Sequence, residues 1–361
     1  PLKLNNDKLG SYSLINVDLV PDFDRNGQID SNDKRKVTVD EPFRWWINDD
    51  DDTTEATGEG DTPGSGNPDY LNTKVDSSRD LVDFFPLYLD LKDMLEGMPE
   101  DKFEYYLAHD DGAFNFFESL DIKPTGAIDV NGSSAFIRNV SLAQSYGYKT
   151  VKRVTADGVR LSNELLGAIK GFDSGVVLLE ARAETTNPIK IKVKPISGGV
   201  KTTIGEFPVN ISGVEEMFRY VNLRSISGGD TGDAPTRSGE PSNYPDNLTT
   251  SGKYIAQMHG FNVNAFKARG WSSEVFKRMH QLGSKARFVG IAWFGDPGRD
   301  DATGGLDYHQ AVFNGFKTSK SLASQLNFTN GDVTIIGHSL ANLVISSAIE
   351  DYGFSKRQND Q

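Results

Sequence analysis

The sequence contains no cysteine. This absence excludes a disulfide framework, thiolate zinc sites and cysteine-based catalysis, and it says little about the compartment in which the protein works. The chain also lacks any apolar run that approaches the ~20 residues a helix needs to cross a bilayer, so no transmembrane segment is expected. It opens at Pro1 without an initiator methionine, which indicates a processed or truncated end.

Basic residues are scarce relative to acidic ones, with 38 Lys and Arg against 51 Asp and Glu and a formal net charge of −13. The imbalance is concentrated in residues 1–76, where 8 basic and 17 acidic residues give a balance of −9. Because no basic stripe is available to neutralise phosphates, nucleic-acid binding is not expected. The acidic terminal region instead favours divalent cations, with a solvated acidic tail as the alternative.

The length of 361 residues predicts two or three domains. The residue pattern changes twice along the chain. It is first acidic and rich in loop-forming residues, then consists of short runs typical of β-strands, and finally indicates alternating strands and helices. We therefore expect a multidomain chain with four segments: an acidic calcium-binding module over 1–76, an all-β sandwich over 77–224, a linker over 225–252, and an α/β doubly wound parallel sheet over 253–361.

A twelve-residue stretch from Asp22 to Asp33 has the spacing of a calcium loop. Gly27 supplies the bend at the sixth position, and Asp33 holds the twelfth position, where a longer Glu would be the usual bidentate ligand. The expected ion is Ca²⁺, and the alternative is a solvated acidic turn. The six predicted ligands contribute side-chain or backbone oxygens, and they are Asp22, Asp24, Asn26, Gln28, Asp30 and Asp33.

Four consecutive carboxylates follow, Asp49, Asp50, Asp51 and Asp52. Adjacent carboxylates repel one another unless a cation or solvent intervenes, so they are candidates for further ligands to the first ion or to a second one. An exposed acidic loop is the alternative. The twelve-residue loop resembles those of dockerins and related extracellular EF-hand-like repeats, but no clean second copy follows it, so cohesin binding is not expected.

The middle of the chain has many short apolar or alternating runs separated by turn residues, as in an all-β sandwich. In Ile189–Lys194, apolar residues alternate with lysines, which predicts a strand with one buried face. Asn187-Pro188 separates this run from the apolar run Val176–Ala183, which suggests a hairpin-like connection. The run Val214–Leu223 is expected to close the sandwich.

Strands and helices alternate from Tyr254 onwards, which predicts a parallel, doubly wound sheet. The third strand, Val333–Ile336, runs into Gly337-His-Ser-Leu-Ala341 and then into a predicted helix. A strand, a sharp turn with Ser339, and a helix form the arrangement called a nucleophile elbow, in which the serine hydroxyl is held clear of the backbone. The backbone N–H of Leu340 would then lie at a helix N-terminus, where it can face an oxyanion.

Residues 253–361 resemble the α/β-hydrolase superfamily, in particular its bacterial lipase- and esterase-like members. The resemblance depends on His259-Gly260 after the first strand and on the elbow around Ser339. It implies that the His-Gly loop lies beside the elbow and contributes one N–H to the oxyanion hole, from Phe261 or Asn262, together with the N–H of Leu340. It also implies a structural role for His259.

The resemblance is incomplete, because only 22 residues follow Ser339 and none is a histidine. In the family, the acid and the His base follow the nucleophile in sequence. We therefore expect them outside this chain, either in a downstream segment after Gln361 or on a second polypeptide that completes the sheet. Two other interpretations remain open: an upstream base, of which His309 is the best candidate, or a domain that has lost catalysis.

The sequence thus predicts a serine ester hydrolase with a structural calcium ion, in an exported bacterial protein that is extracellular or bound to the cell surface. A serine without a base is a poor nucleophile, so a rival hypothesis of a different class stays open. In that hypothesis the chain is a non-enzymatic surface, adhesive or filament protein with a degenerate hydrolase-like domain.

Overall fold

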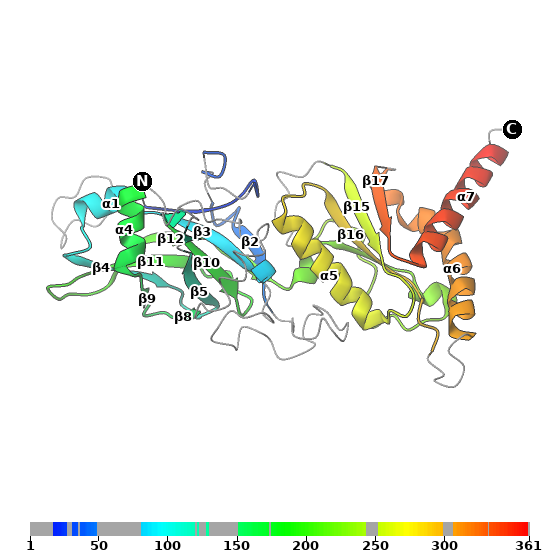
Figure 1. Cartoon of the computed structure of the whole chain (residues 1–361), viewed down its shortest axis with the longest axis horizontal. Coiled ribbons are helices and arrows are strands. Elements are labelled where there is room, and N and C mark those ends of the chain that lie inside the picture. Colours follow the sequence, from blue (N-terminus) through cyan, green and yellow to red (C-terminus); the bar gives the residue numbers. More distant parts are fainter. Residues whose placement is uncertain are drawn as a thin grey trace. The chain divides into compact units, whose positions relative to one another are not determined.

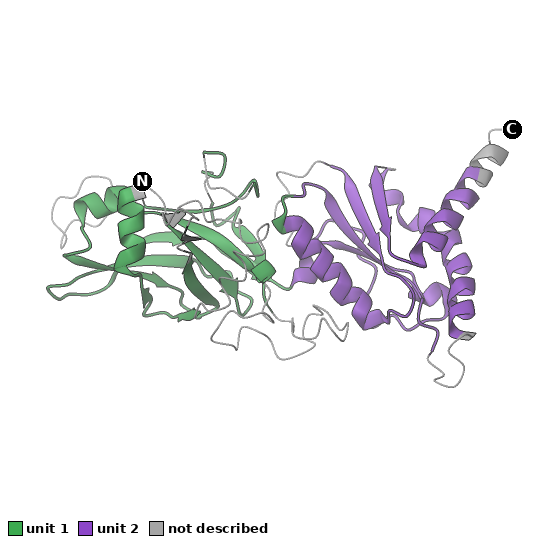
Figure 2. Cartoon of the chain, in the orientation of Figure 1, with its two compact units in different colours: residues 1–49, 68–213, 281–283 green, residues 50–67, 214–280, 284–361 purple. Residues whose placement is uncertain are grey.

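The computed structural model describes eleven stretches of the chain: residues 17–26, 31–34, 37–48, 81–119, 121–122, 128–129, 151–172, 175–242, 252–298, 306–330 and 332–359. The chain divides into two compact units. Unit 1 comprises Pro1–Asp49, Pro68–Gly213 and Gln281–Gly283, and unit 2 comprises Asp50–Asn67, Val214–His280 and Ser284–Gln361 (Figure 2).

Unit 1 is built mainly from two antiparallel sheets (Figure 1). The five-stranded sheet has the order β1 (Asp18–Pro21), β3 (Phe84–Asp90), β10 (Val176–Ala181), β5 (Phe114–Ser119) and β8 (Lys152–Val154). The four-stranded sheet has the order β12 (Thr202–Phe207), β11 (Ile189–Pro195), β4 (Phe103–Ala108) and β9 (Val159–Arg160).

Smaller elements complete the described part of unit 1. The strands β2 (Phe43–Trp46) and β13 (Val209–Ser212) pair in parallel, and β6 (Asp121–Ile122) pairs with β7 (Ile128–Asp129). The described residues of this unit also form two α-helices, α1 (Lys92–Gly97) and α4 (Asn163–Phe172), and a short 3-10 helix, η3 (Leu81–Asp83).

The predicted strand at Ile189–Lys194 is confirmed as β11, and its apolar residues Ile189, Ile191 and Val193 are buried. The predicted hairpin across Asn187-Pro188 is wrong. β10 pairs with β3 and β5 in one sheet, whereas β11 pairs with β12 and β4 in the other. All six residues of β10 are buried, because it is a central strand whose neighbours come from elsewhere in the chain.

The described residues of the expected N-terminal module, 17–26, 31–34 and 37–48, are instead integrated into unit 1. β1 extends the five-stranded sheet by pairing with β3, and β2 pairs with β13. The indole N–H groups of Trp45 and Trp46 donate to the backbone oxygen and to the carboxylate of buried Asp83, at 3.0 and 2.7 Å. These strands are short, and only pairing with later segments gives them partners for their backbone groups.

Unit 2 contains a four-stranded parallel sheet with the order β14 (Arg219–Asn222), β16 (Arg287–Ala292), β15 (Tyr254–Met258) and β17 (Val333–Gly337). Its α-helices are α5 (Ala265–Gln281), α6 (Leu306–Gln325) and α7 (Ala341–Asn359). The 3-10 helices among its described residues are η4 (Val214–Met217), η5 (Arg224–Ser227) and η7 (Asn327–Thr329).

The two faces of this sheet carry different helices (Figure 1). On β16, Phe288 and Gly290 face α5, since Phe288 contacts the ring of Phe276 and Gly290 lies against Ser272. The alternate residues Val289 and Ile291 belong to a buried cluster that includes side chains of α6 and α7. The period of two along a strand therefore places α5 on one face and α6 with α7 on the other.

Two expectations near the unit boundary differ from the structure. The run expected to close the β-sandwich provides η4 and β14 of unit 2, and β14 lies at an edge of the parallel sheet. The predicted linker over 225–252 begins with η5, and its described part packs onto unit 2. Thr236 accepts a hydrogen bond from the N–H of Asn222 at 3.0 Å, and Arg237 forms a β-bridge with Tyr220.

The packing of α5 on the sheet predicts the effect of a single methyl group. A Cβ at Gly290 would lie 2.7 Å from Ser272 Cβ and 3.0 Å from the ring of Tyr220, so Gly290→Ala should lower the free energy of unfolding of unit 2 by about 1–3 kcal/mol. Gly353→Ala in α7 is the matched control, because a Cβ there meets nothing within 4 Å. The control should leave stability equal or raise it by roughly 0.5–1 kcal/mol. Urea melts of the two variants measure the difference, and equal stabilities would contradict the packing argument.

Candidate functional site

The turn between β17 and α7 holds Ser339 in a strained conformation. Ser339 has a φ of 52°, in the left-handed region that a non-glycine residue adopts only at a cost, and its side chain is exposed. A Cβ at Gly337 would lie 2.6 Å from Ile345 and 3.3 Å from the backbone nitrogen of Asn342, so α7 returns close to the strand. The serine hydroxyl is therefore presented at the carboxyl end of a parallel strand, at the start of a helix.

Hydrogen bonds hold this turn in place. The N–H groups of Ala341 and Asn342 donate to the carbonyls of His338 and Ser339, both at 3.1 Å. The side-chain amide of Asn342 donates to the carbonyls of Gly337 at 3.1 Å and Ser339 at 2.9 Å. A left-handed serine persists only where its surroundings determine the backbone, and these four bonds supply that constraint.

The loop after β15 lies against the same turn. The N–H of His338 donates to the carbonyl of Met258 at 3.0 Å, and a Cβ at Gly260 would lie 3.0 Å from Ser339 Cβ and 2.8 Å from His338 Nδ1. The structure thus brings Gly260 and Ser339 together, because β15 and β17 are neighbours and parallel strands end at the same edge of a sheet. Only a glycine allows an approach this close.

Two backbone N–H groups flank this contact. In the described part of the chain, the N–H groups of Phe261 and Leu340 have no hydrogen-bond acceptor, whereas that of Asn262 donates to the carbonyl of Gly295 at 2.9 Å. Of the two alternatives for the loop donor, Asn262 is therefore occupied and Phe261 is available. Two available donors beside one exposed serine have the composition of an oxyanion hole.

His259 orients the peptide group that carries the Phe261 donor. Its Nε2 accepts the N–H of Trp293 at 3.2 Å, so its proton is on Nδ1, which donates to the carbonyl of Gly260 at 3.0 Å. In a trans peptide the C=O and the N–H point in opposite directions, so the N–H of Phe261 points away from His259. Burial lowers the pKa of His259 to about 4, and the imidazole is neutral at pH 7.

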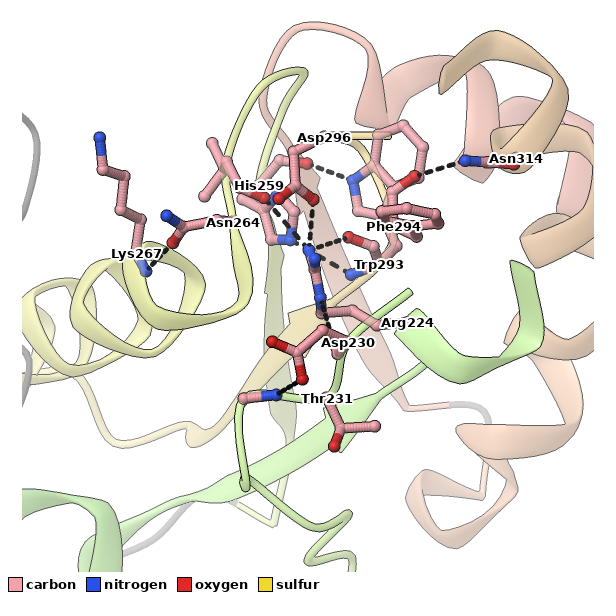
Figure 3. Close-up of polar contacts among 12 residues, drawn as sticks. Arg224, Asp230, Thr231, His259, Asn264, Lys267, Trp293, Phe294, Asp296 and Asn314 are labelled. Carbon is pink, nitrogen blue, oxygen red and sulfur yellow. Dashed lines mark hydrogen bonds and ion pairs between the residues drawn. The ribbon is translucent and has the colours of Figure 1, made fainter. Parts of the chain in front are cut away.

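A buried arginine, which the sequence analysis did not single out, joins the loops of this edge (Figure 3). Arg224 is 2% exposed and lies in η5, directly after β14. Its guanidinium donates to the carbonyl of Asp230, to the carbonyls of Val263 at 3.3 Å and Trp293 at 3.2 Å, and to Asp296 Oδ1 at 2.7 Å. One side chain therefore connects the segments that follow β14, β15 and β16.

Within the described residues, the Asp296 carboxylate is the only charged group among the hydrogen-bond acceptors of Arg224. Burial raises the pKa of Asp296, and the adjacent Arg224 opposes this increase. A guanidinium can satisfy several acceptors in a fixed fork, which a lysine cannot do. No sequence signal marks this residue, because its partners lie in three separate segments.

Within the described part of the chain, the Ser339 hydroxyl has no hydrogen-bond partner, so no described histidine is hydrogen-bonded to it. Both ring nitrogens of His259 already form hydrogen bonds, and the ring of His338 packs edge-on against that of Trp271. His309, the upstream candidate for a base, is exposed on α6. Within the described residues, the exposed hydroxyl of Ser339 and the N–H groups of Phe261 and Leu340 therefore lie in neighbouring loops, and no histidine is hydrogen-bonded to that hydroxyl.

The described part of the predicted calcium loop brings three carboxylates together. Oxygens of Asp22, Asp24 and Asp33 all lie within 4.8 Å of one another, and Asp22 and Asp33 are buried. The N–H of Asp24 donates to Asp33 Oδ1 at 3.1 Å, and the N–H of Asn26 donates to Asp24 Oδ1 at 3.1 Å. Carboxylate oxygens are the hard ligands that Ca²⁺ prefers, so this donor set fits the ion. The other predicted ligands lie outside the described residues: Gln28, Asp30, Asp49, Asp50, Asp51 and Asp52.

Comparisons with protein-family models, with curated proteins and with solved structures give no match to this chain. The assignment of a function therefore depends on the geometry of the two candidate sites. In the described part of the chain, no helix combines the length and the apolar character needed to cross a membrane.

The neutral His259 predicts a dependence of stability on pH. The unfolded chain protonates this histidine near pH 6.5, whereas the folded chain does so only near pH 4, so unfolding takes up a proton between these values. Stability should be complete above about pH 6.5 and fall by up to about 3 kcal/mol as the pH drops towards 4. Urea melts across this range should show a smaller fall for His259→Asn, with exposed His309→Asn as the control. Identical profiles for the protein and His259→Asn would contradict the assignment.

Proposed function

We propose that unit 2 is a serine ester hydrolase domain in which Ser339 is the nucleophile. The observation that carries the proposal is the contact of Gly260 with the turn at Ser339, which leaves the N–H groups of Phe261 and Leu340 available on either side of an exposed hydroxyl. The left-handed backbone of Ser339 supports it further, because strain of this kind is concentrated at functional sites.

In the proposed reaction, Ser339 Oγ bonds to the ester carbonyl carbon while its proton passes to a base. The carbonyl oxygen becomes negatively charged in the tetrahedral intermediate, and the amides of Phe261 and Leu340 donate to it. The intermediate expels the alcohol, which takes up the proton, and water then hydrolyses the acyl-serine. Removing one donor of this kind typically costs about 10²–10³ in rate.

The base is proposed to come from a downstream segment or a second polypeptide that pairs with the free edge of β17. Among the described strands, β17 pairs only with β15. Its residue Ile336 is 47% exposed, although strands of parallel sheets are usually buried on both faces. No described histidine is hydrogen-bonded to Ser339, and this edge is where the remainder of such a domain would be added.

The proposal predicts that a small base restores reactivity. A fluorophosphonate should label the protein at Ser339 by forming a bond between Oγ and phosphorus, with fluoride leaving and the serine proton passing to the base. Labelling should be slow in phosphate buffer and at least about tenfold faster in 100 mM imidazole, because imidazole can replace a missing general base. Labelled peptides identified by mass spectrometry, compared with Ser339→Ala, measure the effect.

Ser346→Ala in α7 is the matched control, since this serine is exposed and outside the turn, and it should label like the unsubstituted protein. Gly260→Ala should abolish labelling, because the added methyl group would push the loop after β15 away from the turn at Ser339. If Ser339 is not labelled even with imidazole, the hydrolase proposal fails and the non-enzymatic surface, adhesive or filament protein becomes the better conclusion.

We further propose that unit 1 binds a structural Ca²⁺ ion through Asp22, Asp24 and Asp33, with the remaining ligands from the same loop. Three carboxylates within 4.8 Å, two of them buried, repel one another, and a divalent cation would relieve that repulsion. A twelfth-position Asp in place of Glu favours the weaker calcium affinities of extracellular modules, which agrees with an exported or cell-surface location.

Calcium should therefore stabilise unit 1. At a calcium concentration of 100 times Kd, the free energy of unfolding should rise by about 2.7 kcal/mol, and EDTA should reverse the increase. Asp33→Asn should remove most of the response, whereas Asp40→Asn, an exposed acidic residue of the same region, should leave it intact. Thermal melts and calorimetric titration measure both quantities, and an unchanged melting temperature after EDTA would count against the site.

A further inference from the structure

An aromatic pair lies next to the proposed loop donor. The rings of Phe261 and Tyr308 are arranged edge to face, with centroids 5.2 Å apart and an interplanar angle of 75°. Phe261 is partly buried and packs against the core cluster of unit 2, which contains Leu340, the residue that follows Ser339. The pair therefore contains the residue that carries the proposed loop donor, and α6 contributes its second ring.

Tyr308 leaves much of its ring available to a ligand. It belongs to the first turn of α6 and is 46% exposed despite its contact with Phe261. An aromatic ring that is half exposed gains free energy when an apolar group covers it. An edge-to-face pair also offers ring surfaces in two orientations, which suits either an aryl group or an alkyl chain.

The apolar surface of the pair selects against charged ligands. A carboxylate that covered the rings of Phe261 and Tyr308 would lose hydrating water, which costs free energy unless a partner charge replaces it.

We infer that Phe261 and Tyr308 form the subsite for an uncharged apolar group bonded next to the reacting carbonyl, so that the substrates are esters of aryl or medium-length alkyl groups. This inference rests on the proposed function, because it assigns a substrate class to the site of Ser339. Tyr308 is a specificity-determining residue in this assignment, and it takes no part in proton transfer.

Three fluorophosphonates test the subsite in the presence of imidazole: one with an ethyl group, one with an octyl group, and one with an octyl chain that ends in a carboxylate. The octyl probe should label Ser339 about tenfold faster than the ethyl probe, because a few methylene groups become buried against the rings. The carboxylated probe should be slower than the octyl probe.

Tyr308→Ser should reduce the preference for octyl over ethyl to less than about threefold, and Tyr308→Phe should retain the preference. Phe313→Ser is the matched control, because Phe313 is 55% exposed on the same helix and has no ring contact with Phe261 among the described residues. Equal ethyl and octyl rates in the unsubstituted protein, with Ser339 labelled, would overturn the subsite alone. Absence of labelling by all three probes would overturn both the subsite and the proposed function.

Discussion

The close approach of two backbone segments, the loop after β15 and the turn after β17, is the constraint on which the proposed site depends. It exists because position 260 carries no Cβ, and it is held by the bond between the N–H of His338 and the carbonyl of Met258. The exposed hydroxyl of Ser339 and the available N–H groups meet only through this approach. If the loop moved by the width of a methyl group, the N–H groups of Phe261 and Leu340 would no longer be positioned to act together with the Ser339 hydroxyl.

The loop after β15 is kept in place by buried polar groups whose hydrogen-bond partners come from several segments of the chain. His259 fixes the Gly260 carbonyl and receives the N–H of Trp293, while the carbonyl of Trp293 accepts from Arg224. A network of this kind costs little when every member is paired and a great deal when one member is removed. The same burial that makes His259 neutral thus makes the orientation of the Phe261 amide sensitive to changes at some distance from it.

Local pattern was sufficient to predict the elements of the site, and insufficient to predict how the distant segments pair. The alternation over Ile189–Lys194 and the glycine-flanked turn at Ser339 are features of a few consecutive residues, and the structure has a strand and a strand–turn–helix there. Asn187-Pro188 indicated a change of direction, but a turn does not specify whether the flanking strands pair. The sheet to which β14 belongs, and the burial of Arg224, depend on partners contributed by residues about 40 to 70 positions later.

The position of Arg224 at the start of unit 2 limits how this protein can be divided for study. A fragment that begins near Tyr254, where the alternation of strands and helices becomes visible, would retain the serine turn and the His-Gly loop. It would nevertheless lack β14, η5 and the guanidinium, which would leave the Asp296 carboxylate and the carbonyls of Val263 and Trp293 without their donor. Truncation at that apparent boundary would therefore leave the partly buried Asp296 carboxylate without its positive partner, and a usable recombinant fragment has to begin at or before Val214.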